Sequence, residues 1–271
     1  MPRSPVPGPP STMQLAEITI KTALVKSGIP GVEYVINPYL GCGHGCKYCY
    51  AVFMKKYARR FQGQPWGSFV EAKVNIAEVL RRELARKRQR GRALLSSVCD
   101  PYQPVEGKFR LTRQCLEALR DFGWGIDILT RSPLVVRDLD ILAGAAGVSV
   151  GFSIPTDAEV VRRVTEPQAP PIPARIAALK QVAEAGVRPW VFIAPMLPMN
   201  PAHLIELIAP YAARVRLDPL NYRRQVQSLF HQQGWDYALT DAYAASTRAE
   251  LCRLLGAQAR GEYFGQAKKS S

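Results

Sequence analysis

Six short apolar segments alternate with amphipathic segments along this chain, and this alternation limits its possible folds more than any other feature. Apolar runs of about four to eight residues, bounded by Gly, Pro or Asp, are typical of buried strands, and longer segments with a period near 3.6 are typical of helices. The expected strands are residues 32–36, 93–99, 125–130, 148–154, 188–195 and 214–220. The expected helices are residues 70–88, 112–122, 133–145, 173–186, 201–213 and 240–255.

Near-continuous apolar strands separated by helices indicate an α/β fold, in which helices cover a parallel sheet. Six strands are too few for an eight-unit barrel, so an open partial barrel and a doubly wound sheet both remain possible. In both folds the chemistry gathers at the carboxyl ends of the strands, and these ends carry polar residues and prolines. We expect residues 21–225 to form this unit, residues 1–20 a disordered Pro-rich tail, and residues 226–271 a C-terminal helical extension.

The formal net charge of +14 is concentrated in two basic runs, residues 55–60 and 81–92. A solvated helix face is the simple explanation for one such run. Two runs close to a cysteine loop favour a polyanionic partner, most simply nucleic acid. No zinc-finger spacing or aromatic RNA-binding signature accompanies them, so the runs predict affinity without sequence reading.

The cysteine usage and the N-terminus indicate a cytoplasmic protein. Three of the six cysteines lie in one short loop and the others are scattered, which favours a metal site in a reducing compartment over a disulfide framework. No run approaches the roughly 18 apolar residues of a membrane span, so we expect no membrane association. The first residues, MPRSPVPGPPS, contain Pro where a signal peptide needs an apolar stretch.

The cysteine loop NPYLGCGHGCKYCYA holds Cys42, Cys46 and Cys49 in a C-x3-C-x2-C spacing. A structural zinc site needs four ligands, so it would have to include His44 from the same cramped loop or the distant Cys99. The alternative is a 4Fe–4S cluster, in which three cysteines leave one iron with an open position. An open position on a metal is what a catalytic site keeps for its substrate.

This loop resembles the cluster motif of the radical S-adenosylmethionine (radical SAM) superfamily. Together with CDPYQPVE, LTRSPLVVRDLDIL, VSVGFSIPTD and VFIAPMLP, it is similar to the branch related to spore photoproduct lyase, over about residues 30–220. The resemblance implies an open partial (β/α)6 barrel of TIM type. It also implies a 4Fe–4S cluster on Cys42, Cys46 and Cys49, with S-adenosylmethionine on the open iron as the source of a 5′-deoxyadenosyl radical. An external reductase, flavodoxin or ferredoxin would supply the electron.

The same resemblance implies roles for four residues near the cofactor. Arg131 falls where the lyases carry a Lys near the cofactor carboxylate, and a guanidinium could bind that group through two hydrogen bonds. Ser153 falls where a serine contacts the cofactor. Ser97 and Asp100 lie at the rim of the second strand, where a polar group meets the methionine amine. The plain alternatives are a surface charge for Arg131 and an ordinary strand-end serine for Ser153.

One departure from the lyases concerns the thiol that returns a hydrogen atom to the product radical. The equivalent position here is Ser97, whereas the thiol is Cys99, which would share a strand face with Ser97. Cys99 is therefore a candidate donor, with a buried inert thiol as the alternative. Tyr48 and Tyr50 are candidates for a radical relay, or they pack the cluster loop.

Three functions remain open from the sequence. The first is a DNA-acting radical enzyme, a carbon–carbon lyase that reverses a lesion. The second is a radical enzyme acting on RNA, a metabolite or a protein side chain. The third is a non-catalytic metal-binding module that holds nucleic acid, which the polar rim of the strands disfavours.

Overall fold

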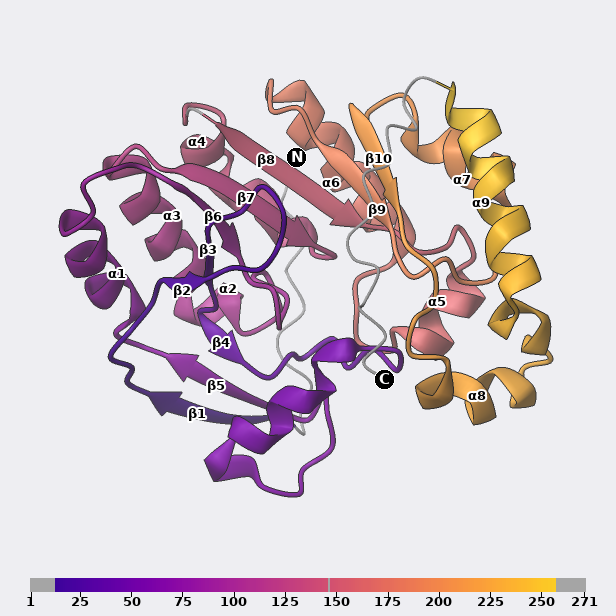
Figure 1. Ribbon diagram of the computed structural model, residues 1–271, viewed down its shortest axis with the longest axis horizontal. Coiled ribbons are helices and arrows are strands. Elements are labelled where there is room, and N and C mark those ends of the chain that lie inside the picture. Colours follow the sequence, from indigo (N-terminus) through magenta and orange to yellow (C-terminus); the bar gives the residue numbers. More distant parts are fainter. Residues whose placement is uncertain (1–12, 146, 257–271) are drawn as a thin grey trace.

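The computed structural model describes residues 13–145 and 147–256, and a curved parallel sheet organises them (Figure 1). The order of its strands is β10-β9-β8-β7-β6-β3-β2, and every pair from β10 to β3 is parallel. Only β2 (Val25–Lys26) runs antiparallel, at the edge beside β3. The six parallel strands are β3 (Tyr34–Ile36), β6 (Arg92–Leu95), β7 (Gly125–Thr130), β8 (Val148–Ser153), β9 (Trp190–Ile193) and β10 (Arg214–Leu217).

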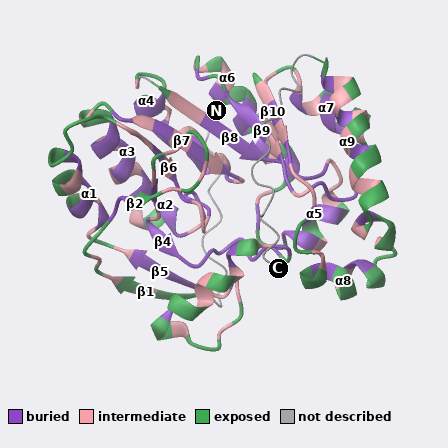
Figure 2. Ribbon diagram, viewed as in Figure 1, coloured by how far each residue is buried: buried purple, intermediate pink, exposed green. Residues whose placement is uncertain are grey.

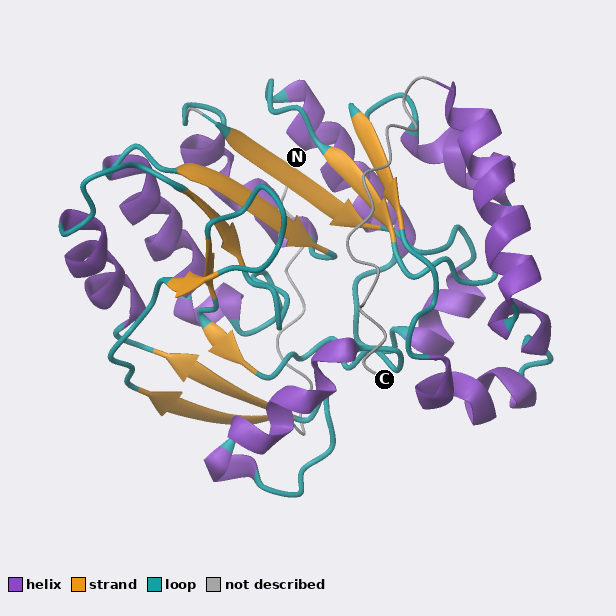
Figure 3. Ribbon diagram, viewed as in Figure 1, coloured by secondary structure: helices purple, strands orange, loops and turns teal. Residues whose placement is uncertain are grey.

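The edge strands β10 and β2 lie at opposite ends of this sheet, so the expected open partial barrel is confirmed. Figure 3 shows the helices around the outside of the sheet. They are α1 (Ile76–Ala85), α2 (Glu106–Phe109), α3 (Leu111–Asp121), α4 (Leu139–Leu142), α5 (Glu159–Thr165), α6 (Ile172–Glu184), α7 (Pro201–Ile208), α8 (Arg223–Gln232) and α9 (Asp241–Leu255). Short 3-10 helices are η1 (Tyr50–Tyr57), η2 (Arg59–Phe61), η3 (Pro133–Asp138) and η4 (Asp236–Leu239).

The two faces of the sheet differ in chemistry, as the strand period of two requires. In β7, Ile126 and Ile128 are fully buried in the main hydrophobic core, whereas Asp127 and Leu129 line a cavity on the inner side. Figure 2 shows the same division, with buried residues where helices meet the sheet and exposed residues on the outer helix faces. One side of the sheet therefore packs in the hydrophobic core, and the other side lines the cavity.

A second sheet with the order β1-β5-β4 corrects two predictions. Residues 14–18, predicted to be part of a disordered tail, form the strand β1 (Gln14–Ile18); residues 1–12 lie outside the described residues. The predicted helix 70–88 begins too early, because β5 (Phe69–Lys73) precedes α1. β5 lies between β1 and β4 (Tyr39–Leu40), so its apolar residues are buried by strand pairing and not on a helix face.

Other boundaries also differ from the predictions. The strand predicted over 93–99 ends at Leu95, because Ser96 adopts a left-handed φ of 64° that a strand cannot continue. The helix predicted over 133–145 is divided into η3 and α4. The predicted C-terminal extension contains α8, η4 and α9 up to residue 256, and residues 257–271 lie outside the described residues.

Candidate active site

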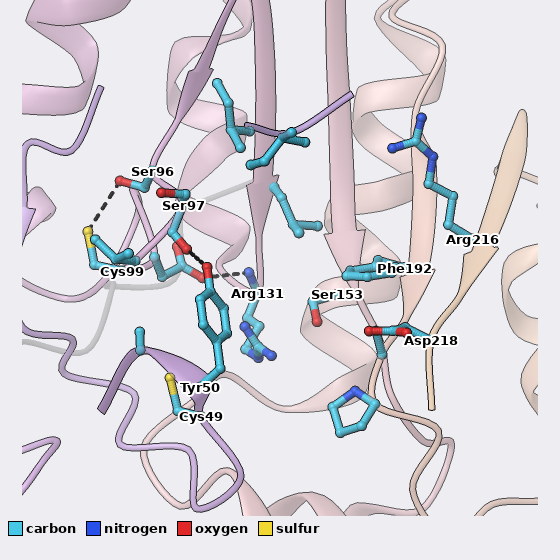
Figure 4. Close-up of a pocket in the computed structure, with 18 of the residues that line it drawn as sticks. Cys49, Tyr50, Ser96, Ser97, Cys99, Arg131, Ser153, Phe192, Arg216 and Asp218 are labelled. Carbon is cyan, nitrogen blue, oxygen red and sulfur yellow. Dashed lines mark hydrogen bonds between the residues drawn. The ribbon is translucent and has the colours of Figure 1, made fainter. Parts of the chain in front are cut away.

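A cavity of about 650 Å³ lies between the inner faces of the strands and the cysteine loop (Figure 4). Cys42, Cys46 and Cys49 all line it, and all three are free thiols. The loop follows β4, and it lines the cavity together with residues at the carboxyl ends of the parallel strands, where functional sites of barrel folds lie. The structure therefore brings the three predicted metal ligands to one cavity.

Glycines allow the cysteine loop to pack closely against its neighbours. Gly41 has a φ of 88°, and a Cβ there would lie 2.4 Å from the carbonyl oxygen of Phe69. A Cβ on Gly67 would lie 2.7 Å from the Cα of Gly45. The side chain of Gln103 then fixes the loop from the other side, because it accepts from the N–H of Gly43 (2.7 Å) and donates to the carbonyl of Gly41 (3.1 Å).

The chemistry of the three thiols fits a metal cluster. Cys42 and Cys46 are each 7% exposed, and burial raises the pKa of Cys46 to about 12, against the opposing effect of Arg131. Burial disfavours a bare thiolate, whereas coordination to a metal replaces the proton and removes that cost. Within residues 13–145 and 147–256, no three His, Cys, Asp or Glu side chains are grouped to hold a single metal ion. His44, the alternative zinc ligand, is buried with Nε2 3.2 Å from Oδ2 of Asp100.

Asp100 is a buried carboxylate that joins the ends of two neighbouring strands. Its oxygens accept from Thr130 Oγ1 (2.6 Å) and from the backbone N–H groups of Arg131 (2.8 Å) and Tyr102 (2.9 Å). Burial acts to raise the pKa of Asp100, but His44 and these hydrogen bonds outweigh it and hold the pKa at about 2. Asp100 lines the cavity as a charged group already bound by the protein, and contact with a cofactor amine stays a prediction.

Arg131 lines the cavity from the end of β7 (Figure 4). A buried ion-pair network holds its guanidinium group. Its Nε lies 2.6 Å from Oε1 of Glu166, and a terminal nitrogen donates to the hydroxyl of Tyr48 (3.1 Å). Glu166 also pairs with the fully buried Arg175 (2.6 Å) and accepts from the Tyr48 hydroxyl. The guanidinium that the sequence predicts beside the cofactor carboxylate is thus fixed in direction before any ligand arrives.

Two serines predicted beside the cofactor also line the cavity. Ser153 is 1% exposed at the end of β8, and its carbonyl accepts from Arg175 (3.0 Å). The carbonyl of Ser97 accepts from the hydroxyl of Tyr50, and its N–H donates to Asn37 (3.0 Å). Their positions allow contact with a cofactor bound in the cavity, which stays a prediction.

Cys99 faces the same cavity as the cysteine loop, although the strand-face argument for it does not hold beyond Leu95. Its sulfur lies 3.2 Å from Ser96 Oγ and donates to the carbonyl of Tyr39 (3.5 Å). Burial raises the pKa of Cys99 to about 11, so the group carries its hydrogen at neutral pH. Tyr50 also lines the cavity and is 45% exposed. Its ring stacks on that of Tyr222, with 6.4 Å between the ring centroids.

Sequence reasoning missed Glu166, Arg175 and Gln103. Glu166 follows α5 and Arg175 lies within α6, so neither stands in a motif at the end of a strand. Gln103 lies in the segment SVCDPYQ that the sequence marks as part of the rim, but its spacing does not show that it spans the cysteine loop. These residues become functional candidates only through contacts between distant parts of the chain.

The two basic runs lie on different parts of the molecule. Residues 55–60 lie on η1 and η2, which follow the cysteine loop, whereas residues 81–92 lie at the end of α1 and in the segment leading to β6. Figure 1 shows α1 at the left edge and η1 at the bottom. Arg81 in the second run pairs with Asp121 (2.7 Å), and Lys87 donates to the hydroxyl of Tyr34 (2.8 Å).

None of the helices within residues 13–145 and 147–256 has both the length and the apolar composition of a membrane-spanning helix.

Similar folds occur in solved structures of spore photoproduct lyase. A mutant of that enzyme with bound AdoMet and dinucleoside spore photoproduct has a TM-score of 0.66, with 97% of this chain and 88% of that chain covered. A lyase complexed with dinucleoside spore photoproduct has a TM-score of 0.65, over 93% and 82%. The sequence identities are 16% and 17%, so these matches concern the fold.

Closer relatives by sequence include an uncharacterized protein of Methanocaldococcus jannaschii, which is 37% identical over 69% of this chain and 70% of its own length. An uncharacterized Mycobacterium tuberculosis protein is 35% identical over 73% of this chain, and the match spans 61% of that longer protein. A Pseudomonas phage M6 protein named Radical SAM Nalpha-GlyT isomerase is 30% identical over 36% of this chain and 22% of its own length.

The model of the Radical SAM superfamily matches residues 36–209, which hold all three loop cysteines and β4 to β9. This chain belongs to the radical SAM superfamily, and its cofactors are a 4Fe–4S cluster and S-adenosylmethionine.

Proposed function

We propose that this radical SAM enzyme acts on nucleic acid, and specifically that it reverses a DNA base lesion as a carbon–carbon lyase of the spore photoproduct lyase type. The observation that carries the proposal is an aromatic and basic ridge formed by η1 and Tyr222, which reaches the cavity through Tyr50 and Tyr222. Tyr50, Phe53 and Tyr57 on η1 are about half exposed, and Lys56 lies over the rings of Phe53 and Tyr57 at 5.9 and 5.0 Å. Exposed rings beside cations suit stacking of unpaired bases and binding of phosphates.

Residues of this chain are available for both cofactors. Cys42, Cys46 and Cys49 would hold the cluster, and Arg131, with Ser97, Asp100 and Ser153, would bind S-adenosylmethionine. When bound, these cofactors supply a 5′-deoxyadenosyl radical. Because Glu166 and Tyr48 hold the Arg131 guanidinium, the protein aims a positive charge into the cavity at the position proposed for the cofactor carboxylate.

Cys99 and Tyr50 are proposed to complete the reaction. The neutral thiol of Cys99 would give its hydrogen atom to the carbon radical of the product, leaving a sulfur radical. Tyr50 would return a hydrogen atom to that sulfur, and its phenoxyl radical would regain one from the methyl group of 5′-deoxyadenosine. Tyr48 is the second relay candidate, although its hydroxyl is engaged with Glu166 and Arg131. Atoms balance over this cycle, with no oxidant required beyond the cofactor radical.

The solved lyases of this fold hold a dinucleoside photoproduct, which supports a nucleic-acid lesion as the substrate. The partial match to a protein named an isomerase supports a second candidate, in which the radical rearranges its substrate and Cys99 is not needed as a donor. In both cases an external reductase, flavodoxin or ferredoxin would reduce the cluster.

The test is anaerobic reconstitution of the cluster, followed by incubation with S-adenosylmethionine and ultraviolet-irradiated DNA. We expect restored thymines by mass spectrometry only with irradiated DNA, and 5′-deoxyadenosine in less than stoichiometric amount, because the proposed cycle takes its hydrogen atom back. Cofactor cleavage that irradiated DNA does not stimulate would contradict the proposed lesion substrate. Unirradiated DNA of the same sequence is the matched control.

A further inference from the structure

The cavity has a second polar region at the amino ends of the strands, opposite the cysteine loop. We call it the arginine end and define it by Arg92 on β6, Asp127 on β7, Trp190 on β9, and Arg214 and Arg216 on β10. All five residues line the same cavity as the loop cysteines. Figure 4 shows Arg216 on the far side of Phe192 and Ser153 from Cys49 and Tyr50.

Positive charge is in excess at the arginine end. Arg92 lies 3.4 Å from Asp127, whose carboxylate also interacts electrostatically with Arg214 and Arg216. The other acidic residues that line the cavity, Asp100 and Asp218, lie toward the carboxyl ends of their strands. Three guanidinium groups therefore interact with one carboxylate, and among the residues that line this end of the cavity the positive charges outnumber the negative ones.

The indole N–H of Trp190 is a buried hydrogen-bond donor without a partner among the described residues. Its side chain is only 7% exposed, yet Nε1 is buried with no hydrogen-bond partner among the described residues. The Nε of Arg214 is in the same condition. The indole fits because β8 has Gly151 opposite it: a Cβ on Gly151 would lie 2.3 Å from the Trp190 ring. Buried donors are normally satisfied in native proteins, so these two groups point to a ligand that accepts hydrogen bonds.

We propose that the arginine end binds an oxyanion of the substrate, specifically a phosphate group of the nucleotide unit whose reacting carbon faces the cysteine loop. The arginines flank the Trp190 ring, with Arg216 at 4.9 Å and Arg214 at 6.0 Å from its centroid, so their donors are held by stacking. Guanidinium groups bind phosphate through paired, charge-assisted hydrogen bonds. Assignment of the oxyanion as phosphate rests on the proposed nucleic-acid substrate.

The distance along the sheet suits one nucleotide. Trp190 begins β9, and Ala194, which also lines the cavity, follows four residues later. At the rise of an extended strand this separation is roughly 13 Å. A nucleotide whose phosphate lies at the arginine end would thus present its base or sugar near the carboxyl rim, where the radical would form.

The test is equilibrium binding to the reconstituted protein with saturating S-adenosylmethionine, at fixed ionic strength and without turnover. We expect thymidine 5′-monophosphate and inorganic phosphate to bind, and thymidine alone to bind at least roughly tenfold more weakly than its monophosphate. Arg214→Gln and Arg216→Gln should each weaken the monophosphate about tenfold or more, with cluster content and circular dichroism unchanged. Trp190→Phe should weaken it less, because only one neutral donor is lost.

Arg188→Gln is the matched control, because Arg188 is exposed two residues before β9 and does not line the cavity. It should leave the affinity unchanged. Equal affinities for thymidine and its monophosphate, or full affinity in Arg214→Gln, would overturn the site. Displacement of phosphate by S-adenosylmethionine would assign the arginines to the cofactor, and preference for succinate would overturn the assignment to phosphate. Since no turnover is measured, failure of lesion reversal would leave this result standing.

Discussion

Cys99 and Glu166 show how neighbouring charges decide the ionisation of buried groups in one site. Burial by itself acts to raise the pKa of both groups. The hydrogen bond with Ser96 and the charge of Lys73 counter burial only in part at Cys99, whose pKa is about 11. At Glu166, Arg175 and Arg131 together with the Tyr48 hydroxyl outweigh burial and hold the pKa at about 2. The cavity thus has a neutral thiol able to give a hydrogen atom, and a buried carboxylate behind its wall is able to orient Arg131.

Cys99→Ala tests the donor. Cofactor cleavage should continue, because the loop cysteines are untouched, but the DNA product should change from restored thymines to an adduct or misrepaired species. Mass spectrometry of digested DNA measures this change. The double change Ser97→Cys, Cys99→Ser keeps a thiol on the same cavity wall and should recover part of the normal product. Unchanged product identity and yield in Cys99→Ala would make Cys99 a packing residue.

Glu166→Gln tests the ion-pair network. It leaves two guanidinium groups without a counter-charge, and we expect a loss of about 3 kcal/mol of unfolding free energy at pH 7. Because the pKa of Glu166 is depressed from 4.5 to about 2, its contribution is present above pH 4.5 and disappears as pH falls through that window. Urea unfolding of cluster-free protein should show a smaller difference in unfolding free energy between Glu166→Gln and wild type at pH 4 than at pH 7. Glu250→Gln, in an exposed pair with Arg253, should have almost no effect; equal losses in both variants would contradict the prediction.

At the scale of single elements, η1 connects the cysteine loop to the surface. It begins directly after Cys49, its first residue Tyr50 lines the cavity, and its last turn carries Lys55 and Lys56. Under the proposed function, η1 alone could hold a nucleic acid beside the cavity, without any contact from the second basic run. Substitutions on η1 should therefore change DNA binding and leave the cluster and the cavity residues intact.

Phe53→Ala and Tyr57→Ala should each weaken single-stranded DNA binding by roughly fivefold or more, since stacking contributes about 1–3 kcal/mol per base. Tyr237→Ala on η4, also about half exposed, is the matched control and should have little effect. Fluorescence anisotropy at several salt concentrations provides the measurement. Similar losses of DNA affinity in all three variants would contradict the proposal that DNA bases stack on η1.

Charge reversal tests separately whether each of the two basic runs contributes to DNA binding. Lys55→Glu with Lys56→Glu should weaken DNA binding and reduce its salt dependence, because phosphate contacts release counterions. The triple change Arg86→Glu, Arg88→Glu, Arg90→Glu should also weaken binding if DNA reaches the α1 side, with cluster content intact in both. If neither changes the salt dependence, both runs are solvated surface.

At the scale of the whole molecule, the site exists because a curved sheet brings six strand ends to one loop. The three loop cysteines come from one segment, whereas the proposed cofactor contacts come from β7, β8 and the segment after β6. Metal content therefore tests the loop alone. Anaerobically purified protein should be brown and bind about four irons.

Cys46→Ala should abolish the colour and the bound iron, and Cys252→Ala, which removes a thiol on α9 outside the cavity, should leave both unchanged. Iron and sulfide analysis with visible absorbance makes the measurement. One tightly bound zinc ion without sulfide in the wild type would contradict the cluster assignment on these cysteines.

The α/β fold class and the cysteine loop could be predicted from the amino-acid sequence. Six apolar strands, helices such as α6 and α9, and the C-x3-C-x2-C spacing are local patterns, and local patterns can be read from neighbouring residues. Only the tertiary structure decided that Glu166 orients Arg131 across 35 positions, that Gln103 clamps a loop 60 residues earlier, and that three arginines gather around Trp190. It also decided that residues 69–73 are a strand, because pairing with β1 and β4 outweighs a helical apolar pattern. Such outcomes depend on which distant segments meet, and sequence periodicity carries no information on those meetings.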